Sequence, residues 1–177
     1  MEKPLIFDST PLIHLSKSSL SQFLREMPEK KYSPMKVFNE VVREGKKWCA
    51  PEASLVESIF KEKAISVCDI KDEKYLKFVK GMAAENESQP LHETEAEVLC
   101  LAKELNGIAV ADDKVVRSVA RLLGIEVHGT VYILGKLYSR RKIKKETLLS
   151  KVHEMRSAGW YISSEDYYRI IDYLKSL

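Results

Sequence analysis

Two short apolar runs in this sequence stop at an aspartate, and each is followed at once by the start of a helix. Residues 5–7 lead to Asp8 and then to Ser9-Thr10-Pro11, while residues 108–111 lead to Asp112. A brief apolar run of this kind predicts a buried strand. Ser or Thr followed by Pro is typical of the first turn of a helix. The sequence therefore predicts strand-then-helix units with an acid at each junction.

Repeated strand-helix units favour a parallel sheet with helices on both faces, and right-handed crossovers between the strands. We expect an α/β fold, an α/β/α sandwich, in residues 1–138. Beyond residue 138 the pattern is helical only, so residues 139–177 are expected to form a C-terminal helical extension packed on the sheet domain. The expected strands are 5–7, 64–67, 108–111 and 125–127, and the expected helices of the extension are 144–157 and 164–174.

Composition limits the class of protein. The chain has 177 residues, of which 45% are hydrophobic, and this suits one compact domain. No apolar run approaches the roughly 20 residues of a membrane-spanning helix, and no basic-then-apolar leader is visible, so we expect a cytoplasmic protein without a membrane partner. The charges nearly balance, with 29 basic and 26 acidic residues, and three scattered cysteines are expected to be buried thiols.

Four acids are candidates for one site. Ligands of open parallel sheets bind beyond the carboxyl ends of the strands, where Asp8 and Asp112 are expected. The apolar stripes of two helices bring Glu40 and Glu95 to the same sheet. Either aspartate alone is as easily explained as a helix N-cap. Four crowded carboxylates, however, repel one another unless a cation neutralises them, which indicates Mg²⁺ or Mn²⁺ and metal-assisted hydrolysis of a phosphodiester.

Four segments in this order resemble the PIN-domain family. They are residues 5–13 (LIFDSTPLI), 37–41 (VFNEV), 94–102 (TEAEVLCLA) and 110–120 (VADDKVVRSVA). The resemblance covers roughly residues 3–138, and residues 129–163 are similar to the tail of a VapC-like prokaryotic subgroup.

The resemblance implies a metal-dependent ribonuclease that acts on RNA. By position, Asp8 and Glu95 would be the principal metal ligands, Glu40 and Asp112 would complete the site, and Asp113 is the alternate for the fourth place. It also implies that the chain is a candidate toxin with a small antitoxin protein as partner, and a candidate homodimer.

The sequence departs from the family pattern at two positions. Glu95 stands where many relatives have Asp, and Thr94 stands where the subgroup usually has Gly. These departures favour an alternative hypothesis, in which the chain is a PIN-like scaffold of weak or no activity that binds RNA or a protein partner.

Five further residues are weaker candidates for binding RNA or supporting the metal. Ser9 and Thr10 would hydrogen-bond to a metal-bound water or a phosphate, or would simply cap a helix. Arg117 would touch a phosphate or form an ordinary ion pair. Arg140 and Arg141 belong to a basic run that would attract an RNA backbone, although such runs more often form a solvated helix start.

Other polar residues are expected to have structural roles or to lie on the surface. Glu93 and Glu97 are expected on the solvated surface, because they point away from the helix face of Glu95. Glu44 is expected to form an ion pair, in a helix that is expected to end at Gly45. The polar stretch 85–90 is expected to be a loop, and Gly129-Thr130 is expected to start a helix. The four histidines share no spacing, so we expect no zinc site and place them in structural or surface roles.

Overall fold

The computed structural model describes residues 2–84, 91–160 and 162–176, and its centre is a five-stranded parallel sheet. The strands stand in the order β3-β2-β1-β4-β5, and every neighbouring pair is parallel. This confirms the predicted α/β class. The strands are β1 (Leu5–Phe7), β2 (Lys31–Ser33), β3 (Ser66–Val67), β4 (Ile108–Val110) and β5 (Val127–His128).

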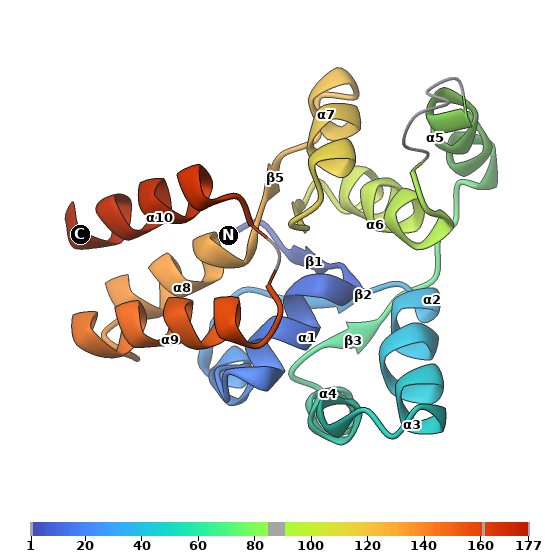
Figure 1. Cartoon of the computed structure of the whole chain (residues 1–177). Coiled ribbons are helices and arrows are strands. Elements are labelled where there is room, and N and C mark those ends of the chain that lie inside the picture. The colour runs from blue at the N-terminus through green and yellow to red at the C-terminus, as the bar shows by residue number, and fades with distance from the viewer. Residues whose placement is uncertain (1, 85–90, 161, 177) are drawn as a thin grey trace.

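Helices cover both faces of the sheet, as predicted (Figure 1). Figure 1 shows α1 and α4 on one side of the strands, and α5, α6 and α7 on the other. The first group comprises α1 (Ser9–Lys17), the 3-10 helix η1 (Ser21–Glu26), α2 (Met35–Phe38), the π-helix η2 (Asn39–Glu44), α3 (Gly45–Lys47) and α4 (Pro51–Lys61). The second comprises α5 (Glu73–Ala84), α6 (Glu93–Glu104) and α7 (Lys114–Leu122).

Strand β2 was not predicted, and its side chains explain why. Lys31 and Ser33 are both buried, so the strand carries no apolar run. The Lys31 ammonium donates hydrogen bonds to the carbonyls of Met27 and Glu29, and the Ser33 hydroxyl donates to the carbonyl of Phe7 at 2.8 Å. Polar groups that are satisfied in this way can be buried at little cost, which hides a strand from a search for hydrophobic patterns.

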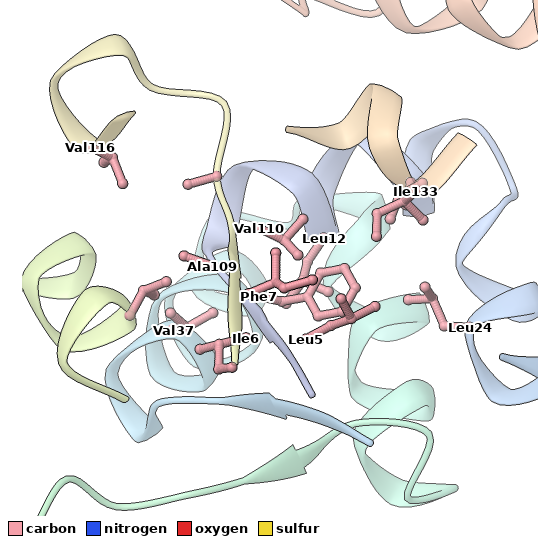
Figure 2. Close-up of a cluster of buried hydrophobic side chains, with 14 of the residues drawn as sticks. Leu5, Ile6, Phe7, Leu12, Leu24, Val37, Ala109, Val110, Val116 and Ile133 are labelled. Carbon is pink, nitrogen blue, oxygen red and sulfur yellow. The ribbon is translucent and has the colours of Figure 1, made fainter. Parts of the chain in front are cut away.

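The core lies on the two central strands. Figure 2 shows Leu5, Phe7 and Val110 of those strands packed with Leu12 of α1 and Ile133 of a later helix. All five side chains are fully buried. Such positions destabilise a domain by about 2–5 kcal/mol when truncated to alanine, so the junctions that follow β1 and β4 stand on the most rigid part of the molecule.

The C-terminal part is helical, as expected. It comprises α8 (Thr130–Ser139), α9 (Lys145–Ser157) and α10 (Ser164–Ser176). Helix α9 contacts α1 and α8, and α10 contacts α9. In Figure 1 these three helices stand together at one end of the sheet. The proposed boundary between residues 138 and 139 stays a prediction. No helix in the described part of the chain is long and apolar enough to cross a membrane.

An ion-pair cluster ties α8 to the segment that enters β2. The carboxylate of Glu29, nearly inaccessible to solvent, accepts hydrogen bonds from Lys136 at 2.7 Å and from both terminal nitrogens of Arg140 at 2.7 and 2.9 Å. Arg140 also pairs with Glu2 at 2.8 Å. These contacts occupy Arg140 structurally, and its predicted contact with RNA stays untested.

Three local expectations were wrong. The helix predicted to end at Gly45 continues to Lys47, because the glycine makes room for α4: an added Cβ would stand 3.0 Å from the Cβ of Ala53. Of the three cysteines expected to be buried thiols, Cys100 is buried, Cys68 is half-buried and Cys49 is exposed. Glu97, expected on the surface, is buried and pairs with Lys36 at 3.2 Å. The loop predicted at residues 85–90 lies outside the described residues.

Candidate functional site

The two junction aspartates follow β1 and β4, the two neighbouring strands from which the chain continues toward opposite edges of the sheet. From β1 the chain passes through α1 to β2 on one side, and from β4 it passes through α7 to β5 on the other. Such a reversal opens a crevice at the carboxyl ends of the two strands, which is where ligands of open α/β sheets bind. Asp8 follows β1 directly, and its backbone N–H donates to the carbonyl of Val110 at 3.0 Å. Asp112 follows β4 two residues later.

Asp8 is a buried carboxylate with an unusual electrostatic environment. Only 4% of the residue is exposed, and its side chain makes no capping hydrogen bond to α1, although it occupies the N-cap position. Burial raises the pKa of Asp8 to about 7, with further increases from the charges of Glu95, Glu40 and Asp112, against a lowering by the Ser9 backbone. The fold thus brings the other three predicted acids within electrostatic reach of Asp8, and N-capping does not explain this carboxylate.

Glu95 and Glu40 come to the crevice from two different helices, α6 and η2. Glu95 lies in the first turn of α6, where its carboxylate accepts a hydrogen bond from the backbone of His92 at 2.7 Å. Burial raises the pKa of Glu95, and the charges of Asp113 and Glu40 raise it further. Glu40 is exposed and lies on the π-helix η2. A π-helical turn in the middle of a helix is frequently found at functional sites.

Asp112 is held in one position by the start of α8. One carboxylate oxygen accepts from the backbone of Thr130 at 2.8 Å, and the other accepts from its hydroxyl at 2.6 Å. Gly129 leaves room for this approach, because an added Cβ would stand 2.5 Å from Asp112 Oδ1. Arg117 lies 3.9 Å from the same oxygen, so the ion-pair interpretation of Arg117 is present in the structure.

Asp113, the alternate to Asp112, has a capping role. Its carboxylate accepts from the backbones of Val115 and Val116, at 2.6 and 3.3 Å, at the start of α7. Its charge nevertheless raises the pKa of Glu95. The charge of Asp113 therefore acts on Glu95, while the charge of Asp112 acts on Asp8.

Two buried polar atoms beside these acids have no hydrogen-bond partner among the described residues. They are the Ser9 hydroxyl, next to Asp8, and the side-chain carbonyl of Asn39, next to Glu40. A buried polar group without a partner costs about 1–3 kcal/mol, which a fold tolerates most readily where a ligand or water completes the bond. Thr10 is exposed and lines a cleft that it shares with Asp112. The expected cap by a Ser9 side chain is not observed.

The donor set fits a hard divalent cation. Within the described part of the chain, no three Asp, Glu, His or Cys side chains converge closely enough to hold an ion by themselves. Mg²⁺ does not need such a cage, since it usually binds through one or two carboxylates and keeps several waters. The Asp8 carboxylate has no cationic partner among the described residues, and the charges of Glu95, Glu40 and Asp112 act on it.

The remaining acids behave as ion-pair partners. Glu93 is exposed and pairs with Lys36 and Lys80, which agrees with its predicted place on the surface. Glu44 pairs with Lys47 at 2.6 Å, as expected. No side-chain partner is found for Arg141 among the residues described, and it stays a candidate for contact with RNA.

The sequence interpretation missed Asn39 and Thr130. Both stand next to a residue that it did consider: Asn39 precedes Glu40, and Thr130 follows Gly129 at the predicted start of a helix. A Thr at a helix start is ordinarily a cap, so nothing local indicated that its hydroxyl donates to Asp112, eighteen positions earlier.

Comparison with known proteins supports one family. A family model described as a PIN domain matches residues 4–176. The match confirms the resemblance drawn from residues 3–138 and extends it through the C-terminal helices. No curated protein matches the sequence.

Proposed function

We propose that this chain, which belongs to the PIN-domain family, hydrolyses RNA phosphodiesters with the help of Mg²⁺ or Mn²⁺ held at its crevice. The family supports a nuclease-type fold. The single observation that carries the proposal is the position of Asp8. It is a buried carboxylate at the reversal point of the sheet, within electrostatic reach of Glu95, Glu40 and Asp112, and it has no cationic partner in the part of the chain that the structure describes.

Each acid has a distinct role in this proposal. Asp8 and Glu95 are the principal ligands, because both are shielded from solvent and raised in pKa by neighbouring acids. Glu40, being exposed, would complete the site from the solvent side. Asp112 is the fourth member, and Thr130 holds its carboxylate in place.

A divalent ion bound by these carboxylates would lower the pKa of a coordinated water and neutralise charge on the phosphate. The Ser9 hydroxyl, which lacks a partner, is positioned to donate a hydrogen bond to the phosphate or to water. Arg117, which is half-exposed beside Asp112, would contact a neighbouring phosphate.

The test is a cleavage assay on single-stranded and structured RNA with Mn²⁺. Asp8→Asn and Glu95→Gln are expected to remove metal-dependent cleavage while the circular dichroism spectrum stays unchanged. Glu93→Gln is the matched control for Glu95→Gln, because Glu93 lies on the same helix but pairs with lysines at the surface. Parental protein that cuts no RNA with Mn²⁺, or an Asp8→Asn variant that cuts as fast as the parent, would exclude the proposal.

A scaffold without catalytic activity is the second candidate function. The specific observations that favour it are the departures at Thr94 and Glu95, and the hydrogen bond that turns the Glu95 carboxylate toward the His92 backbone. RNA binding that is unchanged by a chelator, together with no uptake of Mn²⁺, would select the scaffold over the nuclease.

We also propose, from the family resemblance alone, that the nuclease is the toxin of a toxin-antitoxin pair and forms a homodimer. A small antitoxin would fill the acidic crevice, with an Arg reaching the carboxylates. Expression of the chain alone should then arrest growth, and Asp8→Asn should relieve the arrest. Harmless overexpression of the active parent would contradict the toxin role, and a monomeric mass by light scattering would contradict the homodimer.

A further inference from the structure

A large cleft adjoins the carboxylate site on the side of the C-terminal helices. Its volume is about 1190 Å³, and it lies between the start of α8 and the residues Gly159, Trp160 and Ile162. Asp112, Thr10 and Arg117 border it on the side of the sheet. Trp160 and Tyr173 border it on the side of the C-terminal helices. The cleft therefore opens directly onto one of the four acids, and the C-terminal helices form its far wall.

The end of α9 fixes the position of Trp160. Gly159 adopts a φ of +94°, a left-handed conformation that terminates the helix. The backbone N–H of Trp160 then donates to the carbonyl of Met155 at 2.9 Å, and the backbone N–H of Gly159 donates to the carbonyl of Arg156 at 3.2 Å. These two bonds form the Schellman motif of a helix C-terminus. The backbone of Trp160 is thereby fixed to the end of α9, and its side chain lines the cleft.

Two buried polar atoms of the cleft lack hydrogen-bond partners in the described structure. They are Nε1 of Trp160 and Nδ1 of His14. The two residues are only 4% and 7% exposed, and both line the cleft, with ring centroids 6.1 Å apart. Burial lowers the pKa of His14, and its Nδ1 can donate or accept a hydrogen bond, depending on which ring nitrogen carries the proton. A ligand with polar edges and an apolar body would satisfy both atoms.

The opposite wall presents flat rings. His128 and Tyr132 stack with their centroids 4.1 Å apart and their planes within 10°, and both line the cleft. Three cationic side chains border the same cleft: Lys114 and Arg169 are largely exposed, Arg117 is half-exposed, and each forms an ion pair with an acid at the surface or the cleft rim. Aromatic platforms combined with exposed cations are the features by which proteins hold single-stranded nucleic acid, with bases on the rings and phosphates on the cations.

We propose that this cleft holds one unstacked base of a single-stranded RNA, next to the phosphodiester presented to Asp8 and Asp112. The proposal rests on the proposed function for the identity of the substrate. The base lies among Tyr132, Trp160 and His14, and its polar edge satisfies the two unpartnered nitrogens. The C-terminal helices thus serve as half of the substrate site, since they supply Trp160.

Calorimetric titration with a short single-stranded RNA, in EDTA to prevent metal-dependent cleavage, tests the proposal. Tyr132→Ala is expected to weaken binding by about 5- to 150-fold, the range for loss of one stacking platform. Tyr168→Ala is the matched control, because Tyr168 is exposed on α10 and does not line the cleft. Trp160→Phe, which keeps an aromatic ring but removes the buried donor, is expected to weaken binding by about 2- to 12-fold.

A second set of RNA ligands distinguishes binding of a base from binding of the phosphates. An RNA of the same length with one abasic residue at each position in turn should lose affinity at one position. Equal affinity for all abasic variants, or equal loss in Tyr132→Ala and Tyr168→Ala, would overturn the base site. Unchanged binding by Trp160→Phe would overturn the role of its Nε1. Because no step requires cleavage, a protein that binds in this way but never cuts RNA retains the base site while the proposed nuclease fails.

Discussion

Replacing Glu29 with Gln should destabilise the protein more than the same replacement at an ion pair on the surface. In the folded protein, the Glu29 carboxylate is almost inaccessible and accepts from Lys136 once and from Arg140 twice. Gln would present a neutral acceptor and an NH₂ group to two cations that are themselves only 22% exposed. The change therefore removes one carboxylate partner from each of two partly buried charges, and Arg140 keeps its pair with Glu2.

The expected magnitude follows from those contacts. Breaking a buried ion pair by removing one partner costs about 3–5 kcal/mol. For a chain of this length, each 1 kcal/mol lowers the Tm by about 2–4 °C, so the Tm of Glu29→Gln should fall by about 6–20 °C. The matched control is Glu26→Gln, because Glu26 pairs with Lys142 at the surface. An exposed pair of that kind is worth about 0–1 kcal/mol.

The same cluster predicts a dependence on pH. Burial alone would raise the pKa of Glu29, but hydrogen bonds from Arg140 and Lys136 lower it to about 2, below its usual value of 4.5. Because the folded state holds the ionised form, the stabilisation is fully present above the usual value and is lost as the pH falls toward 2. Urea unfolding measured at several acidic pH values should show this loss in the parent and a shallower loss in Glu29→Gln. Equal Tm values for Glu29→Gln and Glu26→Gln would refute the reasoning.

Three further substitutions test the site and the sheet. Gly129→Ala should reduce RNA cleavage about 100-fold and destabilise the protein by about 1–3 kcal/mol, because its Cβ would displace the Asp112 carboxylate from its two hydrogen bonds to Thr130; cleavage rates unchanged from the parent would contradict this. Ser9→Ala should raise the free energy of unfolding by about 1 kcal/mol, since it removes a buried hydroxyl without a partner, while cleavage falls; a loss of stability in urea would show that the hydroxyl is bonded. Gly107→Ala should destabilise by about 1–3 kcal/mol, because its Cβ would stand 2.7 Å from the carbonyl of Pro4; Gly81→Ala, with open space around it, is the control and should leave the Tm equal or higher.

Strong local signals made the centre of the fold predictable. Strands β1 and β4 are short apolar runs that end at aspartates, and both the strand and its acid are visible without knowledge of the fold. The ends of helices α9 and α10 were predicted to within two residues, because these helices also have strong local sequence signals. Strand β2 was missed, because buried Lys31 and Ser33 satisfy their polar groups with backbone carbonyls.

The site was partly predictable for a different reason. Asp8 and Asp112 could be placed together, because parallel strands end at one edge of the sheet. The hydrogen bond from Thr130 to Asp112 and the position of Trp160 in the wall of the cleft depend on packing between segments far apart in the chain. Glu97 illustrates the same limit: its burial depends on Lys36, from a helix that precedes it by some sixty residues. Contacts of this kind leave no mark in a local sequence pattern.

The central claim is that the crevice carboxylates bind a divalent cation, and calorimetric titration with Mn²⁺ measures this directly. The parent should take up Mn²⁺ saturably, Asp8→Asn should lose most of that binding, and Glu93→Gln should bind as the parent does. Absence of saturable binding by the parent, or equal binding by Asp8→Asn, would contradict the account.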